Sequence, residues 1–352
     1  MRSKNIVIGL FLFITITLTT TFIYFFQVLY TPNIYIDSDK GTEIPIYIPT
    51  GANFEMVMDT LVKKELLHNI MSFRFLAKLL NYTENIRAGR YLIKGDWGNL
   101  QTIRVLRTGM QTPVKLTFNN IRSMPELTEK LSKYVQPGQS EIEQILSDRE
   151  TAEKYGFDTN TFICMFIPNT YEVYWTITAE ELIEKMHREY KVFWSDDRKQ
   201  QAASLKMTPI EAAILASIVE AETKVIDERP RVAGVYINRL RKNMRLQADP
   251  TVVFAHGDFS IKRVLNEHKQ IDSPYNTYKY SGLPPGPINL PSISSIDAVL
   301  NYEQHDYLYF CAKEDFSGYH NFAQTIKEHL NYARLYQKAL KNEIRKGKVN
   351  RQ

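Results

Sequence analysis

The sequence has 352 residues, of which 44% are hydrophobic and 24% are charged, and these values are ordinary for a globular protein. A chain of this length can form more than one domain. Its 44 Lys and Arg residues exceed its 39 Asp and Glu residues only slightly, and no dense basic tract precedes the C-terminal tail, so nucleic acid is not an expected partner.

The first 30 residues predict a membrane anchor. Residues 5–30 carry no charge, and a helix of about 20 apolar residues spans a bilayer. The segment ends in aromatic residues and no small-x-small cleavage site follows, which favours an uncleaved transmembrane helix over a signal peptide. Because Arg2 and Lys4 precede it, the positive-inside rule places residues 31–352 outside the cytoplasm, on a single-pass protein of the inner (cytoplasmic) membrane.

Residues 31–41 are expected to form a short tether, and residues 42–112 a small α/β module. The stretch "IPIYIPTG" alternates as a strand does, and "NFEMVMDTLVKKELL" has the spacing of a helix. Gly89, Gly95 and Gly109 then punctuate a turn, a strand, a second turn and a second helix.

The following residues contain helix start signals of the capping-box type, in which a Ser or Thr precedes a Glu by three positions. The pairs are Ser123 with Glu126, Thr178 with Glu181, and Thr208 with Glu211. Pro209 suits the first position of a helix because its missing N–H has no partner there. A helix is therefore expected from Thr208 to about Lys224.

The remainder of the chain completes a mixed α+β domain over residues 113–352. A strand-and-loop region is expected from "RVAGVYINRL" to "YLYFCAK", with many Pro and Gly residues near 282–291. A polar helix from about Gln324 to Arg345 closes the chain. The predicted class is therefore α+β, with one transmembrane helix before it.

Two acids lie in the apolar stretch "ILASIVEAETKV". With about 100° per residue, Glu222 continues the stripe formed by Ile210, Ile214 and Ile218, whereas Glu220 points to a side of small residues. Burial would raise the pKa of Glu222 and keep it protonated, as a general acid requires. The small residues beside Glu220 leave room for another chain segment or a ligand.

A structural role for both acids is the alternative. Glu222 could emerge into solvent at the helix end and pair with Lys224, Arg229 or Arg231. Glu220 could pair with Lys224 at the i,i+4 spacing.

Amide and phenol side chains and one guanidinium gather after this helix with other polar residues, and they suit a polyhydroxylated, N-acetylated ligand better than a phosphate. They are Asn238, Arg239, Gln247, Asp249, Tyr275, Asn276, Thr277 and Tyr278. Residues 283–287 add a rigid loop with Pro and Gly, which permit close approach of a ligand. Alternatively, "NRL" belongs to a helix with a structural ion pair, and "YNTY" is an ordinary turn.

No metal site or cofactor is expected, because the sequence contains no Cys/His spacing typical of one and no His-Glu-x-x-His motif. Cys164 and Cys311 lie in apolar contexts. Two buried thiols and a disulfide are both compatible with an exported domain.

The sequence resembles the YceG-like family of membrane-anchored endolytic murein transglycosylases. The matching segments are "LASIVEAET", "VAGVYINRLRKNMRLQADPTV", "YNTYKYSGLPPGPI" and, more loosely, "FIPNTYEV" and "HNFAQTIKEH". In addition, "AGRYLIKGDW" with "IRVLRTGM" is similar to the family's LysM-like module. The chain departs from the family at residues 117–127, where a Glu-Gly pair is often found.

The resemblance implies a reaction, a catalytic residue and partners. The family cleaves the β-1,4 bond between N-acetylmuramic acid and N-acetylglucosamine inside a peptidoglycan strand and leaves a 1,6-anhydro end. Its catalytic acid corresponds to Glu222, in agreement with the helical wheel, and Glu220 takes a supporting role. Cell-wall synthases are implied as partners, since such enzymes are thought to end growing strands.

Two other functions remain open at the level of sequence. One is a non-enzymatic scaffold that binds peptidoglycan through residues 42–112 and recruits synthases. The other is a lysozyme-type muramidase with Glu222 as acid and Asp249 as second carboxylate, since hydrolases normally use two.

Overall fold

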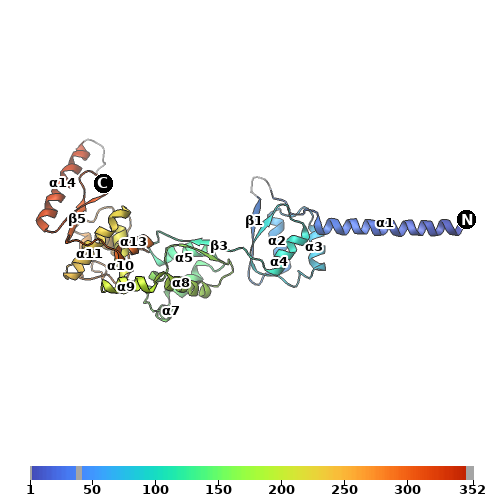
Figure 1. Ribbon diagram of the computed structural model, residues 1–352, viewed down its shortest axis with the longest axis horizontal. Coiled ribbons are helices and arrows are strands. Elements are labelled where there is room, and N and C mark those ends of the chain that lie inside the picture. Colours follow the sequence, from blue (N-terminus) through green and yellow to red (C-terminus); the bar gives the residue numbers. More distant parts are fainter. Residues whose placement is uncertain (1, 37–41, 346–352) are drawn as a thin grey trace. The chain divides into compact units, whose positions relative to one another are not determined.

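The computed structural model describes residues 2–36 and 42–345 and divides into two compact units. Unit 1 comprises Met1–Leu116, Tyr134–Pro137 and Tyr171–Thr178, and unit 2 comprises Thr117–Lys133, Gly138–Thr170 and Ala179–Gln352. Helices and small antiparallel sheets occur together (Figure 1), which confirms the predicted α+β class. Residues 37–41 of the expected tether and residues 346–352 lie outside the described residues.

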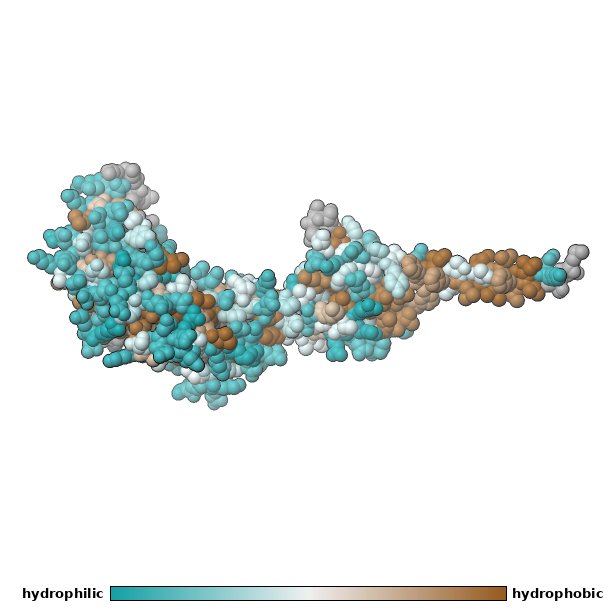
Figure 2. All heavy atoms as spheres, viewed as in Figure 1, coloured by the Kyte–Doolittle hydropathy of each residue, from teal (hydrophilic) through white to brown (hydrophobic). Residues whose placement is uncertain are grey.

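Helix α1 (Arg2–Tyr30) is the segment predicted to be a membrane anchor. Its part Lys4–Tyr30 has a mean hydropathy of 2.4 and is long and apolar enough to cross a membrane. Figure 2 shows apolar residues along most of its exposed length. The hydroxyls of Thr15 and Thr17 donate to carbonyls one turn earlier, which satisfies these polar groups without water. These properties are compatible with the predicted anchor.

Residues 31–36, expected to belong to a tether, pack into unit 1. Ile34 is buried and forms an isolated β-bridge with Leu67. The Asn33 amide donates to the Asn99 side-chain oxygen over 2.6 Å. The described part of this segment is therefore not a free linker, because it buries an apolar side chain and satisfies a buried amide.

The N-terminal α/β module follows this segment. Its elements are β1 (Glu43–Ile48), α2 (Phe54–Lys63), α3 (Ile70–Leu79), β2 (Gly89–Lys94) and α4 (Asn99–Thr108). Strands β1 and β2 pair antiparallel. Gly109 ends α4 in the left-handed conformation, with φ 73°, which glycine adopts without strain. The predicted order of strand, helix, strand and helix is confirmed, with α3 as an additional helix.

The next elements along the chain are a second two-stranded sheet and several helices. They are β3 (Val114–Thr117), α5 (Met124–Ser132), α6 (Gln139–Ser147), α7 (Arg149–Lys154), η2 (Phe162–Met165), β4 (Thr170–Val173), α8 (Ala179–Phe193) and α9 (Asp196–Ser204). The predicted capping box at α5 is only half formed. Ser123 accepts from the Glu126 N–H, but the Glu126 carboxylate accepts from the N–H of Arg122 instead.

The C-terminal part of unit 2 is more helical than predicted. Its elements are α10 (Pro209–Glu222), η3 (Ile226–Glu228), α11 (Arg229–Arg241), α12 (Asp249–His256), η4 (His268–Gln270), α13 (Ile293–Leu300), β5 (Tyr309–Ala312), β6 (His320–Ala323) and α14 (Ile326–Arg345). The stretch "RVAGVYINRL", expected to begin a strand-and-loop region, lies in α11. Its buried Val232, Val235 and Tyr236 recur at helical spacing, and this packing outweighs the strand preference of Val, Ile and Tyr. The closing helix α14 confirms the prediction.

Helix α10 runs through the core of unit 2 (Figure 1). The predicted capping box is present: Thr208 Oγ1 accepts from the Glu211 N–H over 3.2 Å, and the Glu211 carboxylate accepts from the Thr208 N–H over 2.7 Å. Every side chain from Ala212 to Val219 is buried, as expected for a helix that is apolar on all sides. The helix therefore delivers its last turn, with both acids, from a rigid core.

Candidate active site

Glu222 is the last residue of α10, and its carboxyl meets the buried Tyr236 of α11. The Tyr236 hydroxyl donates to Glu222 Oε1 over 2.7 Å. Burial raises the pKa of Glu222 to about 7; the Tyr236 hydrogen bond opposes this shift, and the Asp249 carboxylate adds to it. A carboxyl with this pKa is largely protonated at slightly acidic pH and ionised in the basic range. It can therefore donate and accept a proton near neutrality.

The alternative in which Glu222 pairs with a cation in solvent does not hold. Its carboxyl is partly buried and bound to Tyr236. Arg231 is paired with Glu303 instead, over 3.0 Å. Arg229 donates to three serine hydroxyls.

Glu220 braces the start of α13. One of its oxygens, Oε2, accepts from the Ser292 N–H over 2.6 Å and from the hydroxyls of Ser292 and Ser295 over 2.9 and 2.8 Å. Arg229 Nη1 donates to the same two hydroxyls, so the carboxylate and the guanidinium are joined through serines. The room beside Glu220 is thus filled by another chain segment, one of the two possibilities that the sequence left open.

Asp249 begins α12 and forms a second tyrosine–carboxylate pair. The Tyr278 hydroxyl donates to Asp249 Oδ1 over 2.6 Å, and Lys269 Nζ lies 3.7 Å from the same oxygen. Burial and this hydrogen bond both raise the pKa of Tyr278. Asp249 therefore has an exposed, ion-paired environment, whereas Glu222 has an apolar one.

Glu220, Glu222 and Asp249 line one cleft of about 1070 Å³ in unit 2. Its other lining residues come from α5 and the segment before it, from the end of α10 and the start of α11, from α12 and the loop after it, and from the loop before α13. They are Asn120, Arg122, Glu126, Ala221, Lys224, Arg229, Pro250, Val253, Phe254, Phe259, Ile261, Lys262, Arg263, Val264, Ile288, Asn289 and Leu290. A volume of this size suits an extended ligand such as several sugar units.

Two predicted binding residues of α11 hold the protein backbone instead. The Asn238 amide donates to the carbonyls of His305 and Tyr307. Arg239 is buried and donates to the carbonyls of Leu308 and Leu246. Neither residue lines the cleft, although the charge of Arg239 acts on the pKa of Glu222.

The "YNTY" segment is a hydrogen-bonded turn that ends in Tyr278, the partner of Asp249. Asn276 is fully buried; its amide donates to two backbone carbonyls and its oxygen accepts from the Tyr278 N–H. The Thr277 hydroxyl accepts from the Ala248 N–H. Tyr275 packs against Phe254, with ring centroids 4.7 Å apart. These three residues thus support the wall of the cleft without lining it.

Gln247 lies just before α12 in an exposed position with a left-handed backbone, φ 52°. Its N–H donates to the Thr277 carbonyl. Of the predicted site residues, the structure therefore brings Glu222, Glu220 and Asp249 together in the cleft, with Tyr278 bonded to Asp249.

Sequence reasoning missed Tyr236 and a buried Glu228–His320 pair. Glu228 accepts from the His320 N–H over 2.7 Å, and its other oxygen lies 2.6 Å from His320 Nδ1. Burial pushes the pKa of Glu228 up, but the hydrogen bonds from His320 and Thr223 bring it below its ordinary value. The His320 ring meets Phe310 edge-on, and Phe310 meets Tyr236 edge-on. The helical spacing of Tyr236 could have indicated its position, whereas no sequence signal pairs residues 228 and 320.

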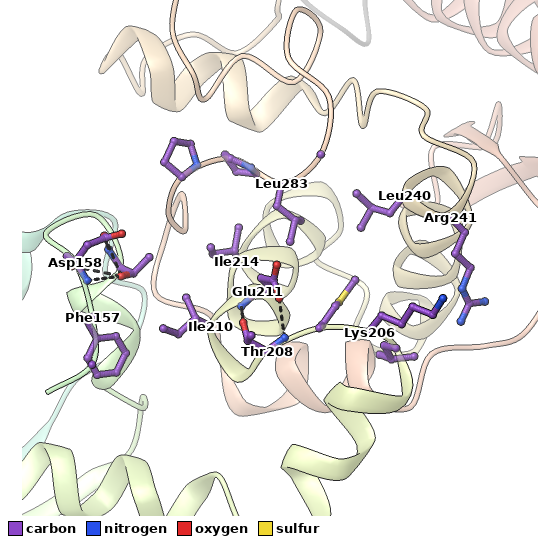
Figure 3. A pocket seen from close by; sticks show the side chains of 17 residues that line it. Phe157, Asp158, Lys206, Thr208, Ile210, Glu211, Ile214, Leu240, Arg241 and Leu283 are labelled. Atoms are coloured by element: carbon purple, nitrogen blue, oxygen red, sulfur yellow. Dashed lines mark hydrogen bonds between the residues drawn. The ribbon is translucent and has the colours of Figure 1, made fainter. Parts of the chain in front are cut away.

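A second depression of about 840 Å³ lies at the other end of α10 (Figure 3). Its two acids already have structural roles: Glu211 completes the capping box, and Asp158 caps a turn through Thr161. Ile210 and Ile214 give it an apolar floor. Both of its acids are therefore held by hydrogen bonds within the protein.

Within residues 2–36 and 42–345, no group of three His, Cys, Asp or Glu side chains is arranged to hold a metal ion. Cys164 and Cys311 are both free thiols. Burial raises the pKa of Cys164 to about 12, so it is unreactive at neutral pH.

Comparison with known proteins gives consistent matches over most of the chain. The model of the YceG-like family matches residues 46–335. An endolytic murein transglycosylase of Bacillus subtilis (strain 168) is 28% identical over 324 residues, which cover 88% of each protein. One of Streptococcus pneumoniae (strain ATCC BAA-255 / R6) is 27% identical over 317 residues, which are 79% of this chain and 55% of that relative.

A solved structure supports the fold. The crystal structure of a YceG-like protein from Listeria monocytogenes aligns with a TM-score of 0.57 and 28% sequence identity. The alignment covers 82% of this chain and 98% of the Listeria chain.

Proposed function

Because the chain belongs to the YceG-like family, we propose that it is an endolytic murein transglycosylase that cleaves the β-1,4 bond between N-acetylmuramic acid and N-acetylglucosamine. The observation that carries this proposal is the Glu222 carboxyl, which lines the cleft and has a pKa raised to about 7. Relatives that bear this name match over most of the chain.

One carboxyl can serve both halves of the reaction. Glu222 first donates its proton to the glycosidic oxygen as the bond from C1 to that oxygen breaks. As the carboxylate, it then takes the proton of the C6 hydroxyl while O6 bonds to C1. The product is a 1,6-anhydro end, water is not consumed, and the acid returns to its protonated form. Tyr236 holds the carboxyl through Oε1, so in this proposal the other oxygen exchanges the proton with the sugar.

A muramidase is the competing reaction, because Asp249 lines the same cleft. It accepts a hydrogen bond from Tyr278 and lies 3.7 Å from Lys269 Nζ, and a muramidase would use it as the second carboxyl group. The mass of the muropeptides released from sacculi separates the two reactions. We expect anhydro ends; products heavier by one water would establish hydrolysis instead.

We further propose that α1 anchors the protein in the inner membrane with residues 31–352 outside the cytoplasm. In this proposal residues 42–112 form a LysM-like module that binds glycan, and residues 113–352 form the catalytic domain. Cell-wall synthases would be partners, since cleavage within a nascent strand ends its growth. A pure scaffold would release no soluble muropeptides from sacculi, and this assay tests it.

A further inference from the structure

The cleft that contains Glu222 is rimmed by side-chain cations. Arg122 precedes α5, Lys224 follows α10, and Lys262 and Arg263 lie in the loop after α12; all four are exposed and line the cleft. Within the described residues, none of the four takes part in an ion pair. The rim therefore offers positive charge that the protein itself does not neutralise.

The acids of the same cleft are already engaged by other groups. Glu126 accepts from the Arg122 N–H, Glu220 from two serines, Glu222 from Tyr236, and Asp249 from Tyr278. Moreover, the raised pKa of Glu222 removes part of its negative charge near neutral pH. The cleft is lined by five cationic side chains, the four of the rim and Arg229, against the four acids, so its formal charge is positive. Charge of one sign in a cleft favours ligands of the opposite sign.

An exposed aromatic ring lies among these cations. Phe259 is 44% exposed, and the Arg122 guanidinium carbon lies 5.2 Å from its ring centroid. Phe254 meets Phe259 edge-on. An aromatic face can pack on a sugar ring, but uncharged N-acetylated sugars give no reason for several unpaired cations around it. The rim fits a glycan whose substituents are anionic.

We propose that Arg122, Lys262 and Arg263 bind carboxylates carried by the lactyl substituent of muramic acid. The inference rests on the proposed function and narrows its substrate to acidic strands. Two sources share this chemistry: the carboxylates of a stem peptide, and the lactyl carboxylate itself on a strand without peptides. The rim selects strands by charge, whereas Glu222 performs the cleavage.

The test measures binding of the full-length protein in detergent to purified sacculi by co-sedimentation, together with the rate of muropeptide release. The variant is Lys262→Gln with Arg263→Gln. Exposed ion pairs contribute little singly, so we expect the half-saturating amount of sacculi to rise about tenfold for the pair, with little change in the maximal rate. The dependence of binding on salt should weaken in parallel. The matched control is Lys338→Gln with Lys341→Gln, which removes two exposed charges of α14 that do not line the cleft.

Three forms of sacculi identify the carboxylate. On sacculi whose carboxyls have been converted to amides, the wild type should bind as weakly as the variant. On amidase-treated sacculi, retained binding assigns the rim to the lactyl carboxylate, and weakened binding assigns it to the stem peptide. Equal binding of wild type and variant to both untreated and amidase-treated sacculi, or equal loss in the control, would overturn the proposal. Co-sedimentation measures binding at the rim whether or not anhydro product forms. Absence of anhydro product would therefore refute the proposed reaction but not the proposed binding of carboxylates.

Discussion

Glu220 and Glu222 stand two residues apart in α10, yet their surroundings give them different chemistry. Glu220 accepts three hydrogen bonds from Ser292 and Ser295, which satisfy a carboxylate. Glu222 has one hydrogen bond from Tyr236 in a desolvated position at the negative end of the helix dipole, where ionisation is disfavoured. The structure thus separates an acid that braces the start of α13 from an acid whose pKa is raised by burial.

Glu222→Gln should lower the rate of anhydro-product release by at least about 10²- to 10⁴-fold, because the amide has no proton to transfer. Glu220→Gln should lower it by less than about tenfold, since it weakens a brace and leaves the transferring group in place. Release of 1,6-anhydro muropeptides from sacculi measures both. The assignment is reversed if Glu220→Gln abolishes release while Glu222→Gln retains it.

Stability distinguishes loss of chemistry from loss of fold in these variants. A carboxyl whose pKa is raised on folding favours the native state when protonated. Its contribution is present below the ordinary carboxyl pKa and is lost as pH rises toward 7. Glu222→Gln removes this pH-dependent loss, so the variant should melt at a higher temperature than the wild type at pH 8 and by a smaller margin at pH 5.

Tyr236→Phe should change the pH dependence of the reaction. The Tyr236 hydroxyl opposes the rise in the pKa of Glu222, so its removal keeps the acid protonated to higher pH. The descending limb of the pH–rate profile should therefore shift to higher pH. The maximal rate should fall roughly three- to tenfold, equivalent to one hydrogen bond of ~1 kcal/mol. Asp249, His320, Arg239 and Tyr278 also act on this pair and stay in place.

A rate profile measured between pH 5 and 9 checks the prediction for Tyr236. Tyr190→Phe is the matched control, because this tyrosine packs on the same core away from the cleft. If Tyr236→Phe lowers the rate equally at every pH, Tyr236 has only a packing role.

The helical stripe in the sequence predicted that Glu222 would be buried, but it could not predict which residues would surround it. Tyr236 follows by 14 positions in the next helix, so only the packing of α10 against α11 brings the two together. Asn238 and Arg239 show the converse. As polar residues near an acid they resembled ligand-binding groups, but in the fold they satisfy backbone carbonyls.

At the scale of elements, α11 was mispredicted and α10 was predicted well. For α10 the local signals agree: an N-cap, a Pro at the first position and apolar residues throughout. For α11 the stretch "RVAGVYINRL" was expected to begin a strand-and-loop region, whereas it forms a helix from Arg229 to Arg241. In the structure Gly234 allows the loop at Glu303 to approach the helix closely.

Gly234→Ala should therefore destabilise unit 2, although alanine favours a helix by about 1 kcal/mol. An added methyl group would lie 2.5 Å from the Glu303 carbonyl oxygen and 2.6 Å from His305 Nε2, which forces the loop to move. Thermal unfolding should show a midpoint several degrees lower. Gly138→Ala, where nothing lies within 4 Å of the added atom, is the control and should change the midpoint little.

At the scale of the whole molecule, the anchor that we propose for α1 would place the cleft on the outer side of the membrane. We predict that a reporter active only in the cytoplasm is inactive when fused after Gln352, whereas a reporter active only outside is functional. The apolar span of 27 residues with Lys4 at its start is the physical reason. Activity of the cytoplasmic reporter would contradict the orientation and deny the cleft access to murein.

Removal of residues 1–112 should weaken binding to sacculi more than it slows the chemistry. The cleft is lined entirely by residues of unit 2, so turnover can persist while the half-saturating amount of sacculi rises. Unit 1 also contains two later segments. In these segments Gln136 accepts from Thr50, and Trp175 packs against Tyr47. The truncated chain therefore exposes the Trp175 ring. A cooperative thermal transition must first show that this chain folds. Complete loss of turnover in a folded truncated chain would show that residues 42–112 form part of the cleft.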